Sequence, residues 1–134
     1  MKIVPIPIHT HDHQQSWTIN HTNKEYFQGL TEHGMEELDI CDQVRIAHSA
    51  DILIGVHGAG LVHSWWMRES GVLLELVPLT KLDRPTYKIL AGLIGRKYYS
   101  VILKNSPQKH HNSVNVSAVL ELLATITKEW TAGA

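Results

Sequence analysis

The sequence has one cysteine and no long apolar segment, and each of these features argues against certain classes of protein. Its one cysteine, Cys41, has no partner for a disulfide within the chain, which fits a reducing compartment such as the cytoplasm. A helix that crosses a bilayer needs about 20 consecutive apolar residues, and no segment approaches that length. Met1–Ile8 is too short and too often interrupted by proline for a signal peptide. We therefore expect no membrane span.

The chain also lacks an excess of basic residues. It carries 12 Lys and Arg against 13 Asp and Glu, and the basic residues are scattered rather than gathered in a stripe. Proteins that bind nucleic acid through its phosphates usually present a basic patch or stripe. The sequence therefore argues against nucleic acid as a partner.

Length and composition are typical of one folded domain. With 134 residues, 43% of them apolar and 19% charged, the chain can bury a single core and is not expected to be disordered. We assign the irregular, proline-containing segment 1–20 to an arm and residues 21–134 to the core of this single domain.

Short apolar runs alternate along the chain with amphipathic segments, which is the pattern of an α/β protein. Strands are predicted at residues 2–8, 35–40, 52–56, 72–77 and 98–103. Helices are predicted at residues 22–34, in a short segment capped by Asp42, at 60–71, at 85–95 and from 116 onward. The helix at 60–71 is expected to carry Leu61, Trp65 and Trp66 on its apolar side. This order predicts a three-layer, Rossmann-like parallel sheet of about five strands with helices on both faces.

A glycine-rich turn follows the predicted strand at 52–56 and reads His57-Gly58-Ala59-Gly60-Leu61. Small residues let the chain turn sharply and let another molecule approach the backbone closely. A helix that starts there would aim its unpaired amides at the turn, which favours phosphate. His57 has an imidazole that can donate to phosphate oxygens or act in proton transfer. The chain lacks both G-x-G-x-x-G and G-K-[ST], so tight packing alone is the competing interpretation.

Glu75 interrupts the apolar run of the strand at 72–77. A buried carboxylate is costly unless it is paired, so this residue needs a specific partner. Beside a nucleotide-binding turn, an acidic residue can accept hydrogen bonds from ribose hydroxyls. The alternative is a salt bridge with Arg68 or Arg84.

The string His57–Leu61, together with Glu75-Leu-Val-Pro78, resembles the C-terminal lobe of family 61 glycosyltransferases. That family includes protein O-linked N-acetylglucosamine transferases and plant xylosyl- and arabinosyltransferases. The resemblance covers about residues 22–103, and Gln43 stands where the family often carries a glutamine. A surface amide on a helix is the alternative interpretation of Gln43.

The resemblance implies the nucleotide-sugar-binding half of a GT-B glycosyltransferase. By this analogy, residues 57–61 hold the diphosphate of a UDP-sugar, Glu75 lies near the ribose and no other cofactor is required. The resemblance also implies a missing acceptor-binding lobe, and an arginine-bearing strand of the family has no counterpart here. Because GT-B catalysis takes place between two lobes, we expect UDP binding without turnover from this chain alone, as for a fragment or a subunit that needs an N-terminal lobe.

Two other functions remain open from the sequence. The first is a non-catalytic α/β module that associates with itself or with another protein through Trp65 and Trp66, although paired tryptophans more often lie in a core or an interface. The second is a small metal-dependent hydrolase. His9, His11 and His13 alternate along one segment with Asp12 among them, so on an extended chain the three imidazoles would share a face.

Overall fold

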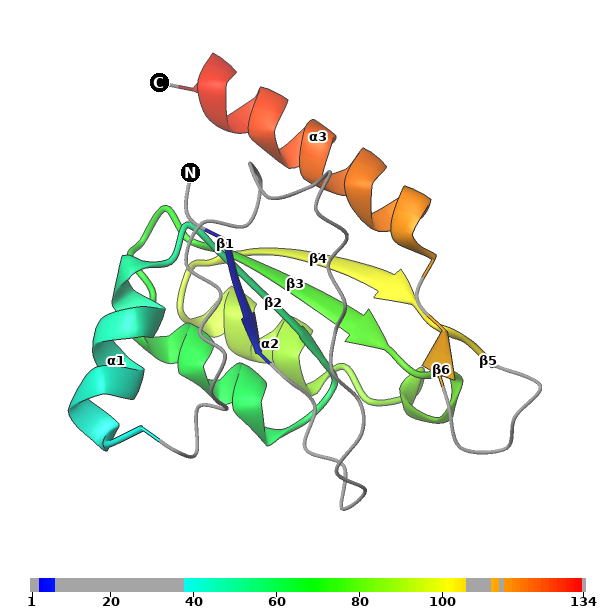
Figure 1. The fold of residues 1–134 in the computed structure, drawn as a ribbon, viewed down its shortest axis with the longest axis horizontal. Helices are drawn as coiled ribbons and strands as arrows, with labels where there is room; N and C mark the ends of the chain where they lie inside the picture. Colours follow the sequence, from blue (N-terminus) through cyan, green and yellow to red (C-terminus); the bar gives the residue numbers. More distant parts are fainter. Residues whose placement is uncertain (1–2, 7–37, 106–111, 114, 134) are drawn as a thin grey trace.

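The computed structural model describes residues 3–6, 38–105, 112–113 and 115–133 (Figure 1). Its centre is a parallel sheet of four strands in the order β1-β2-β3-β4. The strands are β1 (Ile3–Ile6), β2 (Ile52–Val56), β3 (Val72–Val77) and β4 (Lys97–Ile102). The predicted α/β class and parallel sheet are confirmed, with four strands in this sheet among the described residues where about five were predicted.

The two inner strands, β2 and β3, are the most deeply buried. All six residues of β3 and the first four of β2 are buried. Their registers pair Ile52 with Val72 and Val56 with Leu76. Short runs of this kind can be buried on both faces only when layers cover the sheet on both sides, as the sequence predicted.

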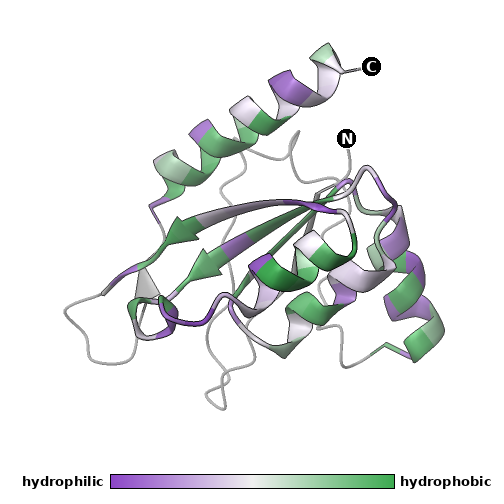
Figure 2. Ribbon diagram, turned by 180° about the vertical axis from the view of Figure 1, so that it is seen from behind, coloured by the Kyte–Doolittle hydropathy of each residue, from purple (hydrophilic) through white to green (hydrophobic). Residues whose placement is uncertain are grey.

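Three elements cover one face of the sheet and one helix covers the other, as Figures 1 and 2 show. On the first face lie α1 (Ile40–Ser49), the 3₁₀ helix η3 (Ala59–Trp66) and α2 (Thr86–Leu93). The second face is covered by α3 (Val116–Ala132). Because the strands follow one another across the sheet in chain order, right-handed crossovers place their connecting helices on the same face.

The two faces carry separate apolar cores. On the side of α3, Ile54 and Leu74 pack with Leu123 and Ile126. On the other side, Leu53 and Leu73 pack with residues of η3 and α2, among them Leu61, Tyr87 and Ala91. Alternate residues of β2 and β3 therefore serve opposite cores, as the two-residue period of a strand requires.

The segment before β2 departs from prediction. The strand predicted at 35–40 is wrong at its described end, because Ile40 is the first residue of α1 and is 63% exposed. Asp39 rather than Asp42 caps this helix, accepting a hydrogen bond from the amide of Asp42 at 2.9 Å. Cys41 is exposed. The helix predicted at 22–34 lies outside the described residues.

The helix after the glycine turn is shorter than predicted and is a 3₁₀ helix. It ends at Trp66, five residues before Gly71. A 3₁₀ helix has three residues per turn, so its inner face repeats every three residues. Leu61, Ser64 and Met67 are accordingly buried, while Trp65 is 53% exposed and Trp66 44%. The predicted α-helical stripe, which placed both tryptophans beside Leu61, is therefore wrong.

The remaining elements complete the second half of the domain. Gly95, with φ +68°, ends α2 as predicted, although Ile89 and Leu93 on that helix are exposed and Tyr87 and Ala91 face the core instead. The short helix η4 (Leu79–Lys81) follows β3. Two short strands, β5 (Lys104–Asn105) and β6 (Asn112–Ser113), pair antiparallel before α3. No helix in the described part of the chain is long and apolar enough to cross a membrane.

Candidate functional site

The turn between β2 and η3 is anchored on both sides by its backbone. The amide of His57 donates to the carbonyl of Leu76 at 2.9 Å, which ties the turn to β3. The amide of Leu61 donates to the carbonyl of Gly58 at 3.0 Å, and the buried Leu61 side chain packs in the core below η3. The turn therefore keeps its shape through bonds at its two ends.

The middle of the turn presents three backbone amides in succession. Among the residues that the structure describes, no acceptor bonds the amides of Gly58, Ala59 and Gly60. Ala59 is exposed, and the glycines on either side are partly exposed. Three consecutive unpaired amides at a helix N-terminus, on an accessible turn, form an arrangement that can accept an anion.

Neither the backbone nor the protein's own packing explains glycine at position 58. Its φ of 168° is extended and open to any residue. A Cβ at this position would meet nothing closer than the carbonyl oxygen of Val56 at 3.7 Å, an ordinary contact. The absence of a side chain here leaves room above the turn rather than relieving strain within the fold.

His57 is held by a buried carboxylate. Its Nδ1 lies 2.5 Å from Oε1 of Glu75, and the two side chains are 10% and 2% exposed. The hydroxyl of Tyr98 donates to the other carboxylate oxygen, Oε2, at 2.6 Å. The ring of Tyr87 on α2 meets the imidazole edge-on, with 5.2 Å between ring centroids. The turn after β2, strands β3 and β4 and helix α2 thus each contribute one side chain to this cluster.

The tyrosines of this cluster stay neutral beside the carboxylate. Burial raises the pKa of Tyr98 well above its usual range, and its hydrogen bond to Glu75 raises it further. Burial also raises the pKa of Tyr87, with a smaller contribution from the charge of Glu75. As a neutral hydroxyl, Tyr98 donates a hydrogen bond to Glu75.

The partner of Glu75 is neither of the two arginines that the sequence suggested. Arg68 pairs instead with Asp51 at 2.5 Å, on the surface. The carboxylate is buried in the middle of the sheet, where His57 and Tyr98 satisfy both of its oxygens. Sequence reasoning missed Tyr98, because only the parallel register of β3 and β4 brings this residue beside the Glu75 strand.

A second hydrogen-bonded group supports the other side of the turn. His63 contacts the carbonyl of Gly60 through Nδ1 and Oε1 of Gln43 through Nε2, both at 2.8 Å. The amide nitrogen of Gln43 donates to the carbonyl of Leu38 at 2.9 Å. Gln43 is therefore a link between α1 and the turn rather than a simple surface amide. His63 was missed in the sequence, although its spacing of three from Gly60 fits a 3₁₀ contact.

The site residues predicted from the sequence come together only in part. The turn residues 57–60 follow the end of β2, and His57 contacts Glu75 within β3, whereas the Leu61 side chain points into the core. The metal candidates His9, His11 and His13 lie outside the described residues. Within the described ranges, no group of three or more His, Cys, Asp or Glu side chains is arranged to hold a metal ion.

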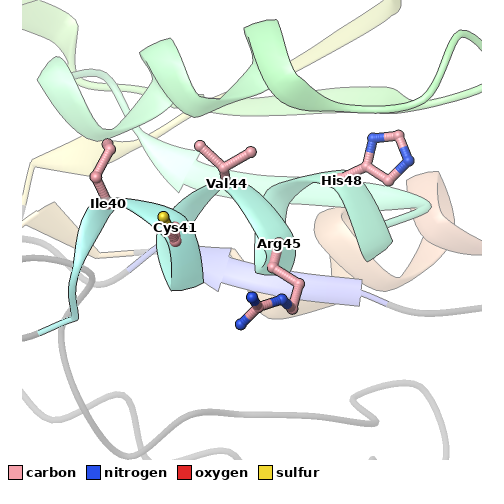
Figure 3. Close-up of a pocket in the computed structure, with 5 residues that line it drawn as sticks. All are labelled: Ile40, Cys41, Val44, Arg45 and His48. Carbon is pink, nitrogen blue, oxygen red and sulfur yellow. The ribbon is translucent and has the colours of Figure 1, made fainter.

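A shallow hollow lies elsewhere, on α1. Figure 3 shows its lining residues, Ile40, Cys41, Val44, Arg45 and His48, all from that one helix. None of them belongs to the glycine turn. This hollow is therefore distinct from the site that the sequence predicted.

Comparison with known proteins relates the segment that contains the glycine turn to a protein family. Residues 16–74 match the family model described as Glycosyltransferase 61, a span that includes α1, β2 and the turn. The chain is related to the family 61 glycosyltransferases. The resemblance seen in residues 57–61 and 75–78 is thereby confirmed at the level of the family.

Individual members of that family align over more of the chain. The EGF domain-specific O-linked N-acetylglucosamine transferase of Gallus gallus is 35% identical over 86 residues, covering 61% of this chain and 16% of the relative. A beta-1,2-xylosyltransferase of Arabidopsis thaliana is 30% identical over 107 residues, covering 75% of this chain and 19% of the relative. The chain thus spans less than a fifth of the length of these family 61 relatives.

Proposed function

We propose that this domain binds the nucleotide diphosphate of a UDP-sugar, in the manner of the donor-binding, C-terminal lobe of a GT-B glycosyltransferase. The observation that carries the proposal is the row of unpaired, accessible amides at Gly58, Ala59 and Gly60. They follow the carboxyl end of an inner parallel strand, which is where open α/β sheets bind their ligands. The relationship to family 61 supplies the chemical class of the ligand.

In this proposal the turn neutralises the departing diphosphate. Transfer of the sugar to a hydroxyl acceptor breaks the bond between the sugar and the diphosphate, so negative charge develops on the phosphate oxygens. Amides already directed at that position stabilise the charge without having to reorient. His57 adds an imidazole donor beside them. The turn and His57 supply these interactions from the protein alone, and the proposal assigns no role to a metal ion.

The predicted contact between Glu75 and the ribose stays a prediction. Both oxygens of Glu75 already accept a hydrogen bond, from His57 and Tyr98, and the side chain is 2% exposed. A direct contact with ribose would require an additional bond to one of these oxygens.

We propose further that the chain alone binds the donor without completing a transfer. The parts that align with it are only 16% and 19% of the two relatives. An acceptor site and a second wall of the active site would then come from sequence beyond this chain.

Titration calorimetry with UDP tests the proposal directly. We expect saturable binding of UDP and weaker binding of uridine, which has the same base and ribose but no diphosphate. His57→Ala should weaken UDP binding about tenfold, the loss expected for one hydrogen bond to a charged ligand. Equal affinity for UDP and uridine, or no binding of UDP to the folded protein, would contradict it.

A second function is favoured by one observation, the exposure of apolar side chains on η3. Val62 is 51% exposed, Trp65 53% and Trp66 44%. A cluster of this kind is typical of an association surface, here between two copies of the chain. Sedimentation velocity of Trp65→Ser should show a smaller fraction of dimer than the parent protein. The matched control is Leu93→Ser on α2, because Leu93 is 79% exposed but distant in sequence from the tryptophans. A parent protein that is entirely monomeric would exclude this function.

The metal-dependent hydrolase stays a prediction that metal analysis of the purified protein can test. Its candidate ligands are His9, His11 and His13. Replacing all three by alanine should remove any bound metal that such analysis detects.

A further inference from the structure

We propose that Glu75 is a positioning residue for His57: its carboxylate fixes the proton on Nδ1 of the imidazole and leaves Nε2 as the nitrogen that meets the diphosphate. Tyr98 holds the carboxylate in turn. This inference rests on the proposed function for its ligand, but the state of the imidazole that it describes can be measured without any ligand.

The first step of the argument is the location of Glu75. It lies in the middle of β3, where every residue is buried. An ionised carboxylate in such a place is destabilising unless its oxygens are hydrogen-bonded. An apolar side chain at this position would pack in the core better than a glutamate does. Its presence calls for a role in orienting the groups that it contacts.

The second step is the chemistry of its contacts. An ionised carboxylate only accepts hydrogen bonds, so the short contact at Oε1 requires a proton on Nδ1 of His57. The hydroxyl of Tyr98 donates to Oε2, so that oxygen has a partner of its own. The two partners come from opposite neighbours of β3, so the carboxylate is held between β2 and β4.

The third step is the orientation of the ring. Its Nδ1 is engaged with Glu75, and the edge-on contact with Tyr87 restrains the ring plane. No acceptor among the described residues bonds Nε2. Since the two nitrogens lie on different sides of the imidazole, Nε2 is directed away from β3. When Nε2 also carries a proton, it can donate to a phosphate oxygen while Nδ1 stays bonded to Glu75.

The charged groups around His57 are few. Glu75 faces it from β3, and the neutral tyrosines Tyr98 and Tyr87 belong to β4 and α2. No Lys or Arg side chain in the described part of the chain bonds Glu75. Among the described residues, the bonded partners of the carboxylate are therefore His57 and Tyr98.

Nuclear magnetic resonance of protein labelled with ¹⁵N in histidine tests this inference. Long-range proton–nitrogen correlations report which ring nitrogen carries the proton, and His57→Gln assigns the signals. In the parent protein without ligand, we expect Nδ1 of His57 to be protonated throughout the pH range in which the protein is folded. In Glu75→Gln, whose amide can either accept or donate, we expect a loss of this preference and a population with the proton on Nε2 alone.

Tyr98→Phe is the matched control, because it removes the other hydrogen bond of the carboxylate and leaves the contact with His57. We expect Nδ1 to remain protonated in this variant. UDP affinity should fall about tenfold in Glu75→Gln and less in Tyr98→Phe. Backbone amide spectra of both variants report whether they fold.

Several results would overturn the inference. An unprotonated Nδ1 in the parent protein would do so, even if Glu75→Gln failed to fold. So would an unchanged ring state in folded Glu75→Gln. A protonated Nδ1 that depends on Glu75, in a protein that does not bind UDP, would instead support the positioning role and contradict the proposed ligand.

Discussion

At the scale of single residues, the glycine turn contains a residue that the fold requires and another that only a bound ligand would require. Leu61 is fully buried and anchors the turn, whereas Gly58 is under no conformational strain and a Cβ there would make only an ordinary contact. A residue that the fold does not require can still be required by a ligand that approaches the backbone closely.

Gly58→Ala should therefore affect binding and leave stability almost unchanged. We expect a change of less than about 1 kcal/mol in the free energy of unfolding, since the new methyl group makes only ordinary contacts. UDP affinity should fall about tenfold or more, because the methyl group occupies the space next to the free amides. Urea denaturation and calorimetry measure the two effects.

Gly92→Ala is the control for this substitution. Gly92 lies within α2 and a Cβ there meets nothing within 4 Å. Alanine should stabilise the helix by roughly 0.5–1 kcal/mol and leave UDP binding unchanged. Equal UDP affinity in the parent protein and Gly58→Ala would show that the ligand does not approach the turn.

At the scale of elements, η3 shows how a change of helix period redistributes the same side chains. Three residues per turn align Leu61, Ser64 and Met67 on the inner face and turn Val62 and the tryptophans outward. The sequence could not predict this, because an apolar segment of eight residues fits either helix type. Two features accompany the tighter 3₁₀ form. Few residues separate β2 from β3 in the chain, and His63 contacts the carbonyl of Gly60.

Neighbouring residues of η3 should differ sharply in their contribution to stability. Leu61→Ala removes a side chain that is fully buried and should lower the free energy of unfolding by about 2–5 kcal/mol. Val62→Ala, at a site that is 51% exposed, should lower it by less than about 1 kcal/mol. Urea denaturation of both variants checks the pair, and similar losses would contradict the 3₁₀ stripe.

At the scale of the whole molecule, one buried group links β3 to β4 and to the turn after β2. Glu75 on β3 is bonded to His57 after β2 and to Tyr98 on β4. These bonds cross the sheet on the face covered by η3 and α2, while α3 packs on an apolar core on the opposite face. The polar cluster and the apolar core are thus separated by the sheet.

Stability should decrease in alkaline solution because of this cluster. The pKa of Tyr98 is raised in the folded protein above its ordinary value of 10.0, chiefly by burial. The unfolded chain therefore loses this proton first, so the contribution is complete below about pH 10 and is lost as the pH rises above it.

Urea denaturation between neutral and alkaline pH measures this dependence. We expect the free energy of unfolding to fall above about pH 10 and to fall less steeply in Tyr98→Phe. Tyr99→Phe is a useful comparison, because the pKa of Tyr99 is raised mainly by its exposed hydrogen bond to Glu129. An identical pH dependence in the parent protein and Tyr98→Phe would contradict the assignment.

The sequence by itself determined the class of fold, the inner strands and the location of the turn. Short, mainly apolar runs such as Val72–Val77, in which Glu75 is the one polar residue, are predicted from local composition, because only a strand covered on both faces buries every residue. The turn was recognisable because the small residues at positions 57–61 occur in a string that the family shares.

Only the tertiary structure decided the partners of Glu75, the 3₁₀ form of η3 and the exposure of its tryptophans. Tyr98 is 23 residues from Glu75 in the chain, and the register of two parallel strands brings them together. Gln43 and His63 meet across α1 and η3 in the same way. Such contacts depend on how elements pack in space, and the periodicity within any one segment carries no information about its neighbours.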